Sequence, residues 1–459
     1  MASNFSWTKQ WYPVTPVSYL DPSEPTAITL LGKRLVLWRE QEGKWIAMDD
    51  TCPHKLAQLS LGKITEQGTL MCRHHGWCFD SAGKCTHMPM VRDEKALATA
   101  CKSERSQVVT YPTQLLQGLL WVWPDDSSTA FADCTAKQPA VIPETQIDHS
   151  ATDWFMSEVP VGYTISVESS FDPSHAQFLH EGIAGFSPER AIPIEHFALL
   201  GEMSSEAGFT LQHSGYNIFN RDMDAKRQFT PPCSNTTIYQ YANGKSVLFQ
   251  LYFVPTKPGY CKHIGKFIGA GAPVKEKFWL KLLPKYLQIG LKHSSNYKLS
   301  NQDLSMMHSQ AVNESVGEET WKNSYFMPAV ADVGIVTFRQ WLDKFAGGEP
   351  AWQGVTAAPF RELSDEQLYD RWHRHTKHCP SCRQSLLLLD KIRNLCQLLT
   401  GILVIIALLL IVINLPLEIV LIPVLLGMLN LLLFYKIGSI RHRFISSIPQ
   451  QGLPIVQLY

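Results

Sequence analysis

The chain has 459 residues, with 41 basic and 41 acidic side chains. This length suits two or three domains, and the balanced charge excludes a strong overall field that would attract nucleic acid. Its 11 cysteines are an odd number spread over a long chain, which excludes a compact secreted disulfide scaffold and favours reduced thiols in metal or redox sites. The first residues, MASNFSWTKQWYPV, contain no apolar run, so we expect neither a signal peptide nor a transit peptide.

The N-terminal part of the chain is expected to be a small all-β domain. Residues 26–48, 68–85 and 106–125 contain β-branched and aromatic runs that are interrupted by turn residues. Such runs are typical of short strands. We therefore predict a β domain over residues 1–135, followed by a larger domain over residues 136–345.

Four residues of the β domain form a metal-binding pattern. Cys52 and His54 form C-x-H, and Cys72 and His75 form C-x-x-H after a gap of seventeen residues. Two thiolates and two imidazoles suit a structural zinc ion. They also suit a Rieske [2Fe–2S] cluster, in which two cysteines hold one iron and two histidines hold the other. The flanking segments CPHKLAQLSLGKI and HGWCFDSAGKC resemble Rieske domains, so we predict the cluster, which would accept an electron and pass it on.

Residues 136–345 mix strand and helix patterns, which indicates an α+β domain. The segment 246–255 has a strand pattern, whereas 275–293 and 302–316 have helix patterns. This domain carries the first ligands of a second metal site.

The segment SVESSFDPSHAQFLHEG contains Asp172, His175 and His180. The two histidines are about 140° apart on an ideal helix, so both reach one metal only if the helix is broken, and Pro173 favours a break. Two histidines and one carboxylate leave open positions for O2 in non-haem Fe(II) oxygenases. An isolated pattern of this kind is often incidental, but a Rieske cluster requires an electron acceptor.

We choose Asp303 as the carboxylate ligand of this iron. It stands at the beginning of the helix pattern of residues 302–316, where an acidic residue is also common without any metal. Three other acidic residues remain as alternatives: Asp332, Glu314 and Glu318.

The C-terminal part contains two long apolar runs. After a polar connector over residues 346–390, residues 394–417 and 419–435 contain no charged side chain. Each run is about the 20 residues that a membrane span needs, so we predict a transmembrane helical hairpin over residues 391–440 and a tail over 441–459. The alternative is a helical hairpin buried in a soluble core. Basic residues on both flanks place both ends of the hairpin on the cytoplasmic side: they are Lys391, Arg393, Lys436, Arg441 and Arg443.

Several segments together resemble one known family. They are KQWYPVTPVSYLD, MDDTCPHKLAQLSLGKI, CRHHGWCFDSAGKC, YPTQLLQGLLWVWPD, FDPSHAQFLH, the late CPSC and the apolar tail. In this order they resemble the pheophorbide a oxygenase group, which includes chlorophyllide a oxygenase and the translocon-associated Rieske protein of chloroplasts. The resemblance covers nearly the whole chain.

The resemblance implies a helix-grip-type catalytic domain, with a mononuclear Fe(II) held by His175, His180 and Asp303. It implies ferredoxin as the electron donor, O2 as co-substrate and an apolar, chlorophyll-type tetrapyrrole as substrate. It further implies a head-to-tail homotrimer, in which Asp172 links His175 of one subunit to the cluster ligand His75 of its neighbour. The alternative function is a non-catalytic redox-sensing or scaffold subunit of a membrane complex.

The same resemblance implies the location of the protein. A thylakoid or plasma membrane of a cyanobacterium, or the chloroplast equivalent, would carry the hairpin. Two positions differ from many relatives: Ser169 replaces an asparagine, and His74 replaces a tyrosine.

The motif CPSC, with Cys379 and Cys382, belongs to neither predicted metal site. The resemblance implies a regulatory dithiol that thioredoxin reduces. A metal site with the nearby His373, His375 and His378 is an alternative, and so are two unpaired thiols in a linker.

Overall fold

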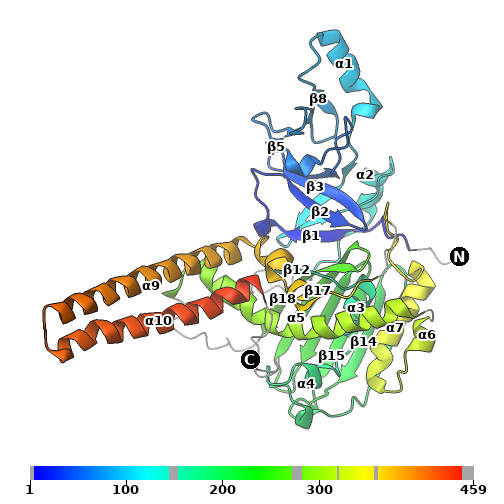
Figure 1. Ribbon diagram of the computed structural model, residues 1–459. Helices are drawn as coiled ribbons and strands as arrows, with labels where there is room; N and C mark the ends of the chain where they lie inside the picture. The colour runs from blue at the N-terminus through cyan, green and yellow to red at the C-terminus, as the bar shows by residue number, and fades with distance from the viewer. Residues whose placement is uncertain are drawn as a thin grey trace. The chain divides into compact units, whose positions relative to one another are not determined.

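The computed structural model describes residues 5–143, 154–183, 185–270, 282–317, 320–355 and 360–446. The chain forms two compact units: residues 1–272 with 302–362, and residues 273–301 with 363–459. The first unit contains the residues of both predicted iron sites, and the second contains the apolar hairpin (Figure 1). The mixture of sheets and helices confirms the α+β prediction.

The N-terminal part of the first unit consists of three small antiparallel sheets. Their strand orders are β1-β11-β10, β2-β3-β4-β9 and β5-β6-β7-β8. The strands are β1 (Tyr12–Pro16), β2 (Thr26–Leu30), β3 (Lys33–Arg39), β4 (Trp45–Asp49), β5 (Lys63–Ile64), β6 (Leu70–Met71), β7 (Cys78–Phe79), β8 (Cys85–His87), β9 (Thr110–Tyr111), β10 (Thr113–Leu116) and β11 (Leu119–Val122). Helix α1 (Glu94–Lys102) begins after Asp93, whose side chain accepts a hydrogen bond from the Ala96 amide. The predicted all-β domain is present, with α1 as an addition.

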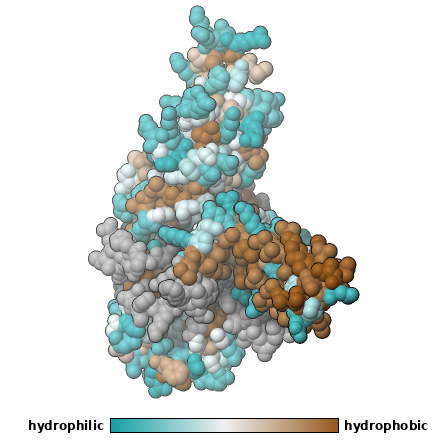
Figure 2. Space-filling model, turned by 90° about the vertical axis from the view of Figure 1, so that its left-hand side faces the viewer, coloured by the Kyte–Doolittle hydropathy of each residue, from teal (hydrophilic) through white to brown (hydrophobic). Residues whose placement is uncertain are grey.

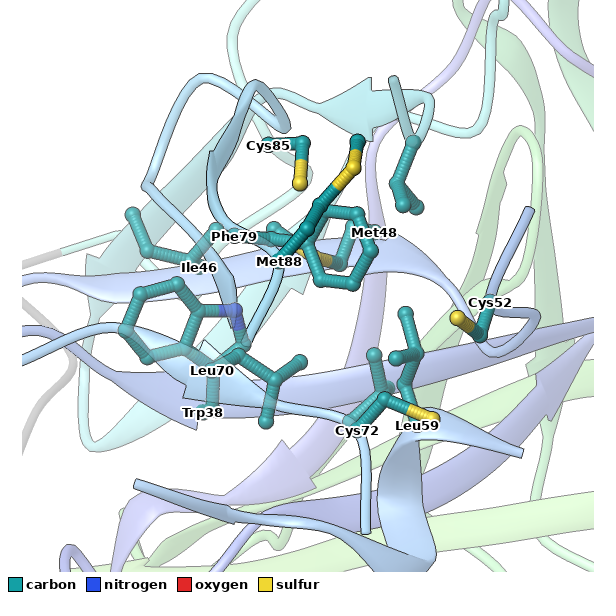
Figure 3. Close-up of a cluster of buried hydrophobic side chains, with 12 residues drawn as sticks. Trp38, Ile46, Met48, Cys52, Leu59, Leu70, Cys72, Phe79, Cys85 and Met88 are labelled. Atoms are coloured by element: carbon teal, nitrogen blue, oxygen red, sulfur yellow. The ribbon is translucent and has the colours of Figure 1, made fainter. Parts of the chain in front are cut away.

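Strands β3 and β4 build the core of this part. Trp38 of β3 and Met48 of β4 are fully buried and pack with Phe79 of β7 in one apolar cluster. Cys52 and Cys72 lie at the edge of the same cluster, on two separate loops (Figure 3). The core thus fixes the bases of both loops that carry the predicted cluster ligands.

The remainder of the first unit is built on a seven-stranded antiparallel sheet, in the order β12-β18-β17-β16-β15-β14-β13. The strands are β12 (Phe155–Val159), β13 (Phe197–Ser204), β14 (Gly208–Ser214), β15 (Asp224–Thr230), β16 (Ser234–Gln240), β17 (Ser246–Lys257) and β18 (Tyr260–Ala270). Strand β17 includes the predicted strand 246–255.

Helices α3 (Tyr163–Phe171) and α7 (Val333–Trp341) cover one face of this sheet. Phe171 and Phe338 stack with ring centres 6.1 Å apart, and Phe229 of β15 packs edge-on against Trp341 at 4.9 Å. A Cβ atom at Gly334 would lie 2.2 Å from the Phe171 carbonyl oxygen. The absence of a side chain there therefore permits α7 to approach the end of α3, next to Asp172.

Apart from the two helices of the apolar hairpin, the remaining α-helices in the described residues are short, except for α5. They are α2 (Ala130–Asp133), α4 (Ala176–Leu179), α5 (Lys285–Val316), α6 (Trp321–Ser324) and α8 (Asp365–Leu368). Helix α5 joins the two segments that were predicted as separate helices, although residues 275–281 lie outside the described residues. Asp303 consequently lies in the interior of a 32-residue helix, and the prediction that it begins a helix is wrong.

Helices α9 (Pro380–Val412) and α10 (Leu417–Ile445) lie side by side (Figure 1). Both are long and apolar enough to cross a membrane, with mean hydropathies of 2.9 and 2.4 in their most apolar windows, of which only 11% is buried. Apolar surface covers the hairpin (Figure 2). Helix α9 begins at Pro380, so the last part of the predicted connector is helical. The turn between the helices contains Asn414 in the left-handed conformation, and residues 447–459 of the predicted tail lie outside the described part of the chain.

Candidate metal centres

The first cluster loop is a tight turn that begins at Cys52. The Cys52 amide donates to the Ala57 carbonyl at 2.8 Å, and the Leu56 amide donates to the Cys52 carbonyl at 2.9 Å. Leu56 has a left-handed backbone conformation, with a φ of +60°. This conformation is uncommon for a residue with a bulky side chain. Its side chain is 73% exposed. The turn thus directs an apolar side chain outward beside the predicted ligands.

The second cluster loop repeats this hydrogen-bond pattern. The Cys72 amide donates to the Trp77 carbonyl at 2.8 Å, and the Gly76 amide donates to the Cys72 carbonyl at 2.9 Å. Gly76 has a φ of +74° and occupies the position that Leu56 holds in the first loop. A Cβ atom there would lie 2.8 Å from Cγ of Pro89. Two equivalent turns therefore present the two cysteine–histidine pairs.

The four predicted ligands fit a [2Fe–2S] cluster. Cys52 and Cys72 are each 1% exposed, and the rings of His54 and His75 lie 4.5 Å apart at an angle of 70°. The His54 ring stacks on Trp77 at 4.7 Å. Nδ1 of His54 is buried and has no hydrogen-bond partner within the described residues, as expected for an atom reserved for a metal. His74 is exposed beside them.

The second site lies where helix α3 ends. The helix stops at Phe171, Asp172 has an extended backbone, and the short helix α4 begins after His175. His175 and His180 thus flank α4 on either side, and the required break in the helix occurs at Asp172 and Pro173.

Asp303 of α5 meets both histidines. Its Oδ1 lies 3.5 Å from Nε2 of His175 and 3.2 Å from Nε2 of His180. This oxygen is buried and accepts no hydrogen bond from the described residues. Nδ1 of His180 lies 3.0 Å from Oε1 of Gln302, which orients the imidazole. Three ligand atoms therefore converge on one point, and two imidazoles with one carboxylate are the donor set of non-haem iron.

Asp172 lies beside this triad. Its Oδ2 is 3.6 Å from Nδ1 of His175, and its Oδ1 accepts hydrogen bonds from the amide and hydroxyl of Ser174, at 2.8 and 2.5 Å. Burial raises the pKa of the Asp172 carboxyl, but the hydrogen bonds from His175 and Ser174 outweigh it and the pKa lies below its usual value. Burial lowers the pKa of His175, but Asp172 and Asp303 outweigh it and this pKa is raised. Asp172 is therefore a carboxylate.

A buried ionic network joins the helices that carry the ligands. Arg339 of α7 contacts Glu168 of α3, and it also contacts Glu314 of α5 at 2.7 Å. Tyr325 accepts hydrogen bonds from Arg339 at 3.2 Å and from Gln310 at 2.7 Å. Burial raises the pKa of Glu168 to about 7, although Arg339 opposes the shift. The network holds α3, which precedes the two histidines, against α5, which carries Asp303.

The sheet holds the end of α3 from the other side. Arg227 of β15 donates to the Ser170 carbonyl at 2.6 Å and to Nε2 of His213 at 2.9 Å. Burial, with the charge of Arg227, lowers the pKa of His213 to about 3. His213 is therefore neutral and accepts the bond that orients Arg227.

The structure separates Asp303 from its alternatives. Glu314 pairs with Arg339, Asp332 accepts a hydrogen bond from the Ala329 amide, and Glu318 lies outside the described residues.

Sequence reasoning missed Gln302 and the Glu168–Arg339 pair. The only available signal for Gln302 is its position next to Asp303, and the sequence contains no pattern that links Glu168 to a residue 171 positions later.

Cys379 and Cys382 are buried in the second unit. They lie beside His293 and His375. His373, which was considered as a ligand, is exposed and contacts Asp370 instead.

Comparison with known proteins agrees with the two predicted cofactors. The model of the Rieske [2Fe–2S] domain matches residues 10–112, and that of pheophorbide a oxygenase matches residues 229–321. The chloroplastic pheophorbide a oxygenase of Oryza sativa subsp. japonica is 32% identical over 404 residues, which are 83% of this chain and 73% of that protein. The chloroplastic flavonoid 8-hydroxylase 2 of Ocimum basilicum is 30% identical over 399 residues, with coverages of 82% and 73%.

Among solved structures, dicamba monooxygenase bound to dicamba has the same fold. Its TM-score is 0.55 at 18% identity, and the match covers 75% of this chain and 98% of that one. The cofactors are accordingly a Rieske [2Fe–2S] cluster and a mononuclear non-haem iron. The chain belongs to the pheophorbide a oxygenase family of Rieske non-haem iron oxygenases.

Proposed function

We propose that this protein is a membrane-anchored oxygenase that uses O2 and ferredoxin-derived electrons to oxidise an apolar, chlorophyll-type tetrapyrrole. The convergence of His175, His180 and Asp303 at the broken end of α3 carries this proposal. A redox scaffold would not need a second site with this donor set. The named activity of the rice relative supports the substrate class.

The residues of the second site would divide the work as follows. His175, His180 and Asp303 would hold the iron, which when bound supplies the activation of O2. Gln302 orients His180 through its ring nitrogen, and the Arg339 network keeps the two ligand helices together. The chain contributes positioning, because every one of these contacts restrains a ligand.

Asp172 is the proposed link in the electron route. Its Oδ2 faces His175, and its side chain remains 26% exposed, so a partner could reach it. His75 is partly exposed, and it stands on a loop next to the exposed His74. We therefore propose a head-to-tail homotrimer in which His75 of one subunit contacts Asp172 of the next. The Asp172 carboxylate would accept a hydrogen bond from an imidazole on either side.

The surface next to the iron site is suited to an apolar substrate. Phe178 of α4, between the two histidine ligands, is 59% exposed. Its neighbour Gln177 accepts a hydrogen bond from Asn217 at 2.9 Å, and Phe219, two residues further, is 71% exposed. The apolar hairpin would anchor the protein where such a substrate dissolves. A thylakoid or plasma membrane of a cyanobacterium, or its chloroplast equivalent, would suit this role, with the first unit on the cytoplasmic or stromal side.

Product analysis with isotope-labelled O2 tests the substrate class. Detergent-solubilised protein, reduced by ferredoxin, would be given chlorophyll precursors and breakdown products, and in a parallel series flavonoids. We expect label in a tetrapyrrole product and none in flavonoids. Because the basil relative is a flavonoid hydroxylase, the opposite result would assign a flavonoid substrate and refute the proposal.

Mixed oligomers test the electron route. A subunit with His75→Ala would lack one proposed ligand of its Rieske cluster. A subunit with His175→Ala would lack one proposed ligand of its mononuclear iron. Co-expressed with different tags and purified through both, they should recover activity, because the intact cluster of one would serve the intact iron of the other. If electrons stayed within each subunit, the mixed oligomers would be as inactive as either variant alone.

A further inference from the structure

A second cluster of metal-binding side chains lies entirely within the second unit. It comprises His293 of α5, His375, Cys379 and Cys382, whose ligand atoms all lie within 4.8 Å of one another. All four residues are buried, with exposures of 4%, 1%, 1% and 1%. The iron sites use none of them, and His293 is not among the histidines that the sequence pattern suggested.

The local fold brings three of these residues together over a short stretch. The spacing H-x3-C-x2-C would place them on one face of a continuous helix. The chain instead forms a π-helical turn at Trp372–Thr376, and it is extended at Cys379, directly before α9. This irregular segment turns the His375 ring and both thiols toward one point. π-Helical turns of this kind are frequent at functional sites.

Helix α5 supplies the fourth residue. Nδ1 of His293 lies 3.6 Å from Sγ of Cys379 and 3.6 Å from Sγ of Cys382, and Nε2 of His375 lies 3.2 Å from Sγ of Cys382. A Cβ atom at Gly290 would lie 2.4 Å from Oγ of Ser385. The glycine therefore permits α5 to approach α9 closely, which brings His293 within reach of the thiols.

These distances match those expected around one tetrahedral zinc ion. With Zn–S bonds of about 2.3 Å and Zn–N bonds of about 2.0–2.1 Å, ligand sulfur and nitrogen atoms are about 3.5 Å apart. A two-iron cluster would require more space between the two ligand pairs. Two thiolates would also neutralise a divalent ion, which favours its burial. Four protein ligands leave no open position, as in structural rather than catalytic zinc sites.

We propose that His293, His375, Cys379 and Cys382 bind a structural zinc ion. The ion fastens the first part of α5 to the segment that leads into the apolar hairpin. This site goes beyond the proposed function and does not depend on it. The competing assignment is a regulatory pair in which Cys379 and Cys382 form a disulfide that thioredoxin reduces.

Metal analysis of the full-length protein tests the proposal. Protein without a histidine tag, purified in detergent without chelators, should contain about one zinc per chain in addition to its iron. Cys382→Ser and His293→Ala should each lose this zinc and keep the acid-labile sulfide of the Rieske cluster. The matched controls are Cys396→Ser, a buried thiol further along α9, and His373→Ala, an exposed histidine next to the site. Both controls should keep the zinc.

Cobalt substitution provides a spectroscopic measurement of the same site. Protein expressed with cobalt should show thiolate-to-cobalt charge-transfer absorption with intense tetrahedral ligand-field bands. The mononuclear iron site contains no thiolate, so cobalt bound there would not give the charge-transfer signal. Cobalt held by Cys52 and Cys72 would give such a signal, but it would persist in Cys382→Ser, so the part of the signal that this variant loses belongs to the proposed site. Absence of that signal in the wild-type protein, zinc that persists in both ligand variants, or a Cys379–Cys382 disulfide in metal-free protein that thioredoxin reduces would each overturn the proposal.

Discussion

Oδ2 of Asp172 lies 3.6 Å from Nδ1 of His175, and Nε2 of the same imidazole lies 3.5 Å from Oδ1 of Asp303. One ring thus contacts a carboxylate on each side. Asp303 faces the metal position, whereas Asp172 lies on the opposite side of the ring, and both side chains are 26% exposed. This arrangement separates the residue that would bind iron from the residue that would connect the iron site to its electron source.

Asp172→Asn should separate metal loading from turnover. The amide preserves the size of the side chain, and all three proposed iron ligands remain, so both metal groups should load. Charge-assisted hydrogen bonds to an imidazole are stronger than neutral ones, and their loss would weaken the link to the cluster. We expect ferredoxin to reduce the cluster normally, while its reoxidation by O2 with substrate slows by at least about tenfold, which corresponds to ~1.4 kcal/mol in the barrier. Stopped-flow absorbance would measure both steps, and a wild-type reoxidation rate with both metals present would refute the bridging role.

Arg339→Met should destabilise the first unit in a pH-dependent manner. Removing one partner of a buried ion pair costs about 3–5 kcal/mol, because Glu168 and Glu314 would lose their common cation. The pKa of Glu168, already raised to about 7, would rise further without Arg339. Because the folded-state pKa lies above the ordinary value of 4.5, the stability contribution of Glu168 is fully present below that ordinary value and is lost as the pH rises from there through the folded-state pKa.

The Tm deficit of Arg339→Met should therefore be larger at alkaline than at mildly acidic pH. The double variant Glu168→Gln with Arg339→Met, which removes the uncompensated charge at Glu168, should recover part of the loss. Thermal melts from mildly acidic to alkaline pH, with the iron content measured alongside, would test the role of the Glu168–Arg339 pair. A deficit that does not vary with pH would contradict the role assigned to Glu168.

Substitutions at Leu56 and Gly76, the two loop residues with a positive φ, should have opposite effects on retention of the cluster. Gly76→Ala would place a Cβ atom 2.8 Å from Pro89 and at a φ of +74°, so we expect loss of the cluster or a marked fall in its retention. Leu56→Gly introduces the residue that the equivalent position already carries and relieves roughly 1 kcal/mol of backbone strain. It should keep the cluster. Acid-labile sulfide and the visible spectrum would measure retention, and equal retention in both variants would show that the turn geometry does not hold the ligands.

Removing the apolar part of the hairpin should make the protein soluble. Nδ2 of Asn430 donates to the Cys396 carbonyl at 2.6 Å, so a short glycine–serine loop could replace residues 397–429 and join the two helices at this point. The contact between Thr376 and the Phe444 carbonyl, at 2.6 Å, would be preserved. We expect the shortened protein in the supernatant with an unchanged cluster spectrum, because the excised segment contains most of the exposed apolar side chains of the hairpin.

A matched control for this excision replaces only Asn414–Pro416 with the same loop. This variant keeps both long helices and should remain in the membrane pellet. If the shortened protein also sedimented with membranes while folded, the hairpin would not be the only anchor.

Local spacing predicted the broken helix at Asp172, and together with the Rieske-like flanking segments it singled out the four proposed cluster ligands. In both cases the ligands are close in sequence, and the chemistry restricts which short spacings can work. The exact context of Asp303 could not be predicted in this way, because the 32-residue helix α5 extends through the point where the pattern suggested a new helix. Its ligand role came from the family resemblance, and the structure adds the contacts with His175 and His180.

Contacts between distant segments were not predictable. His293 lies 82 positions before His375, and no pattern in one sequence joins them. Arg339 and Glu168 are likewise joined only by the packing of α7 on α3. Such pairs depend on how helices pack, which the hydrophobic pattern of one chain does not determine.

The most direct test of the central claim compares Asp303→Ala with Asp332→Ala. The account predicts that Asp303→Ala keeps the Rieske cluster but loses the mononuclear iron, and that it transfers no label from isotope-labelled O2 into a tetrapyrrole. Asp332→Ala, which removes an acidic residue that accepts a backbone hydrogen bond elsewhere, should match the wild-type protein in iron content and labelling. Full mononuclear iron with labelled product in Asp303→Ala would contradict the assignment of this site as the oxygenase centre.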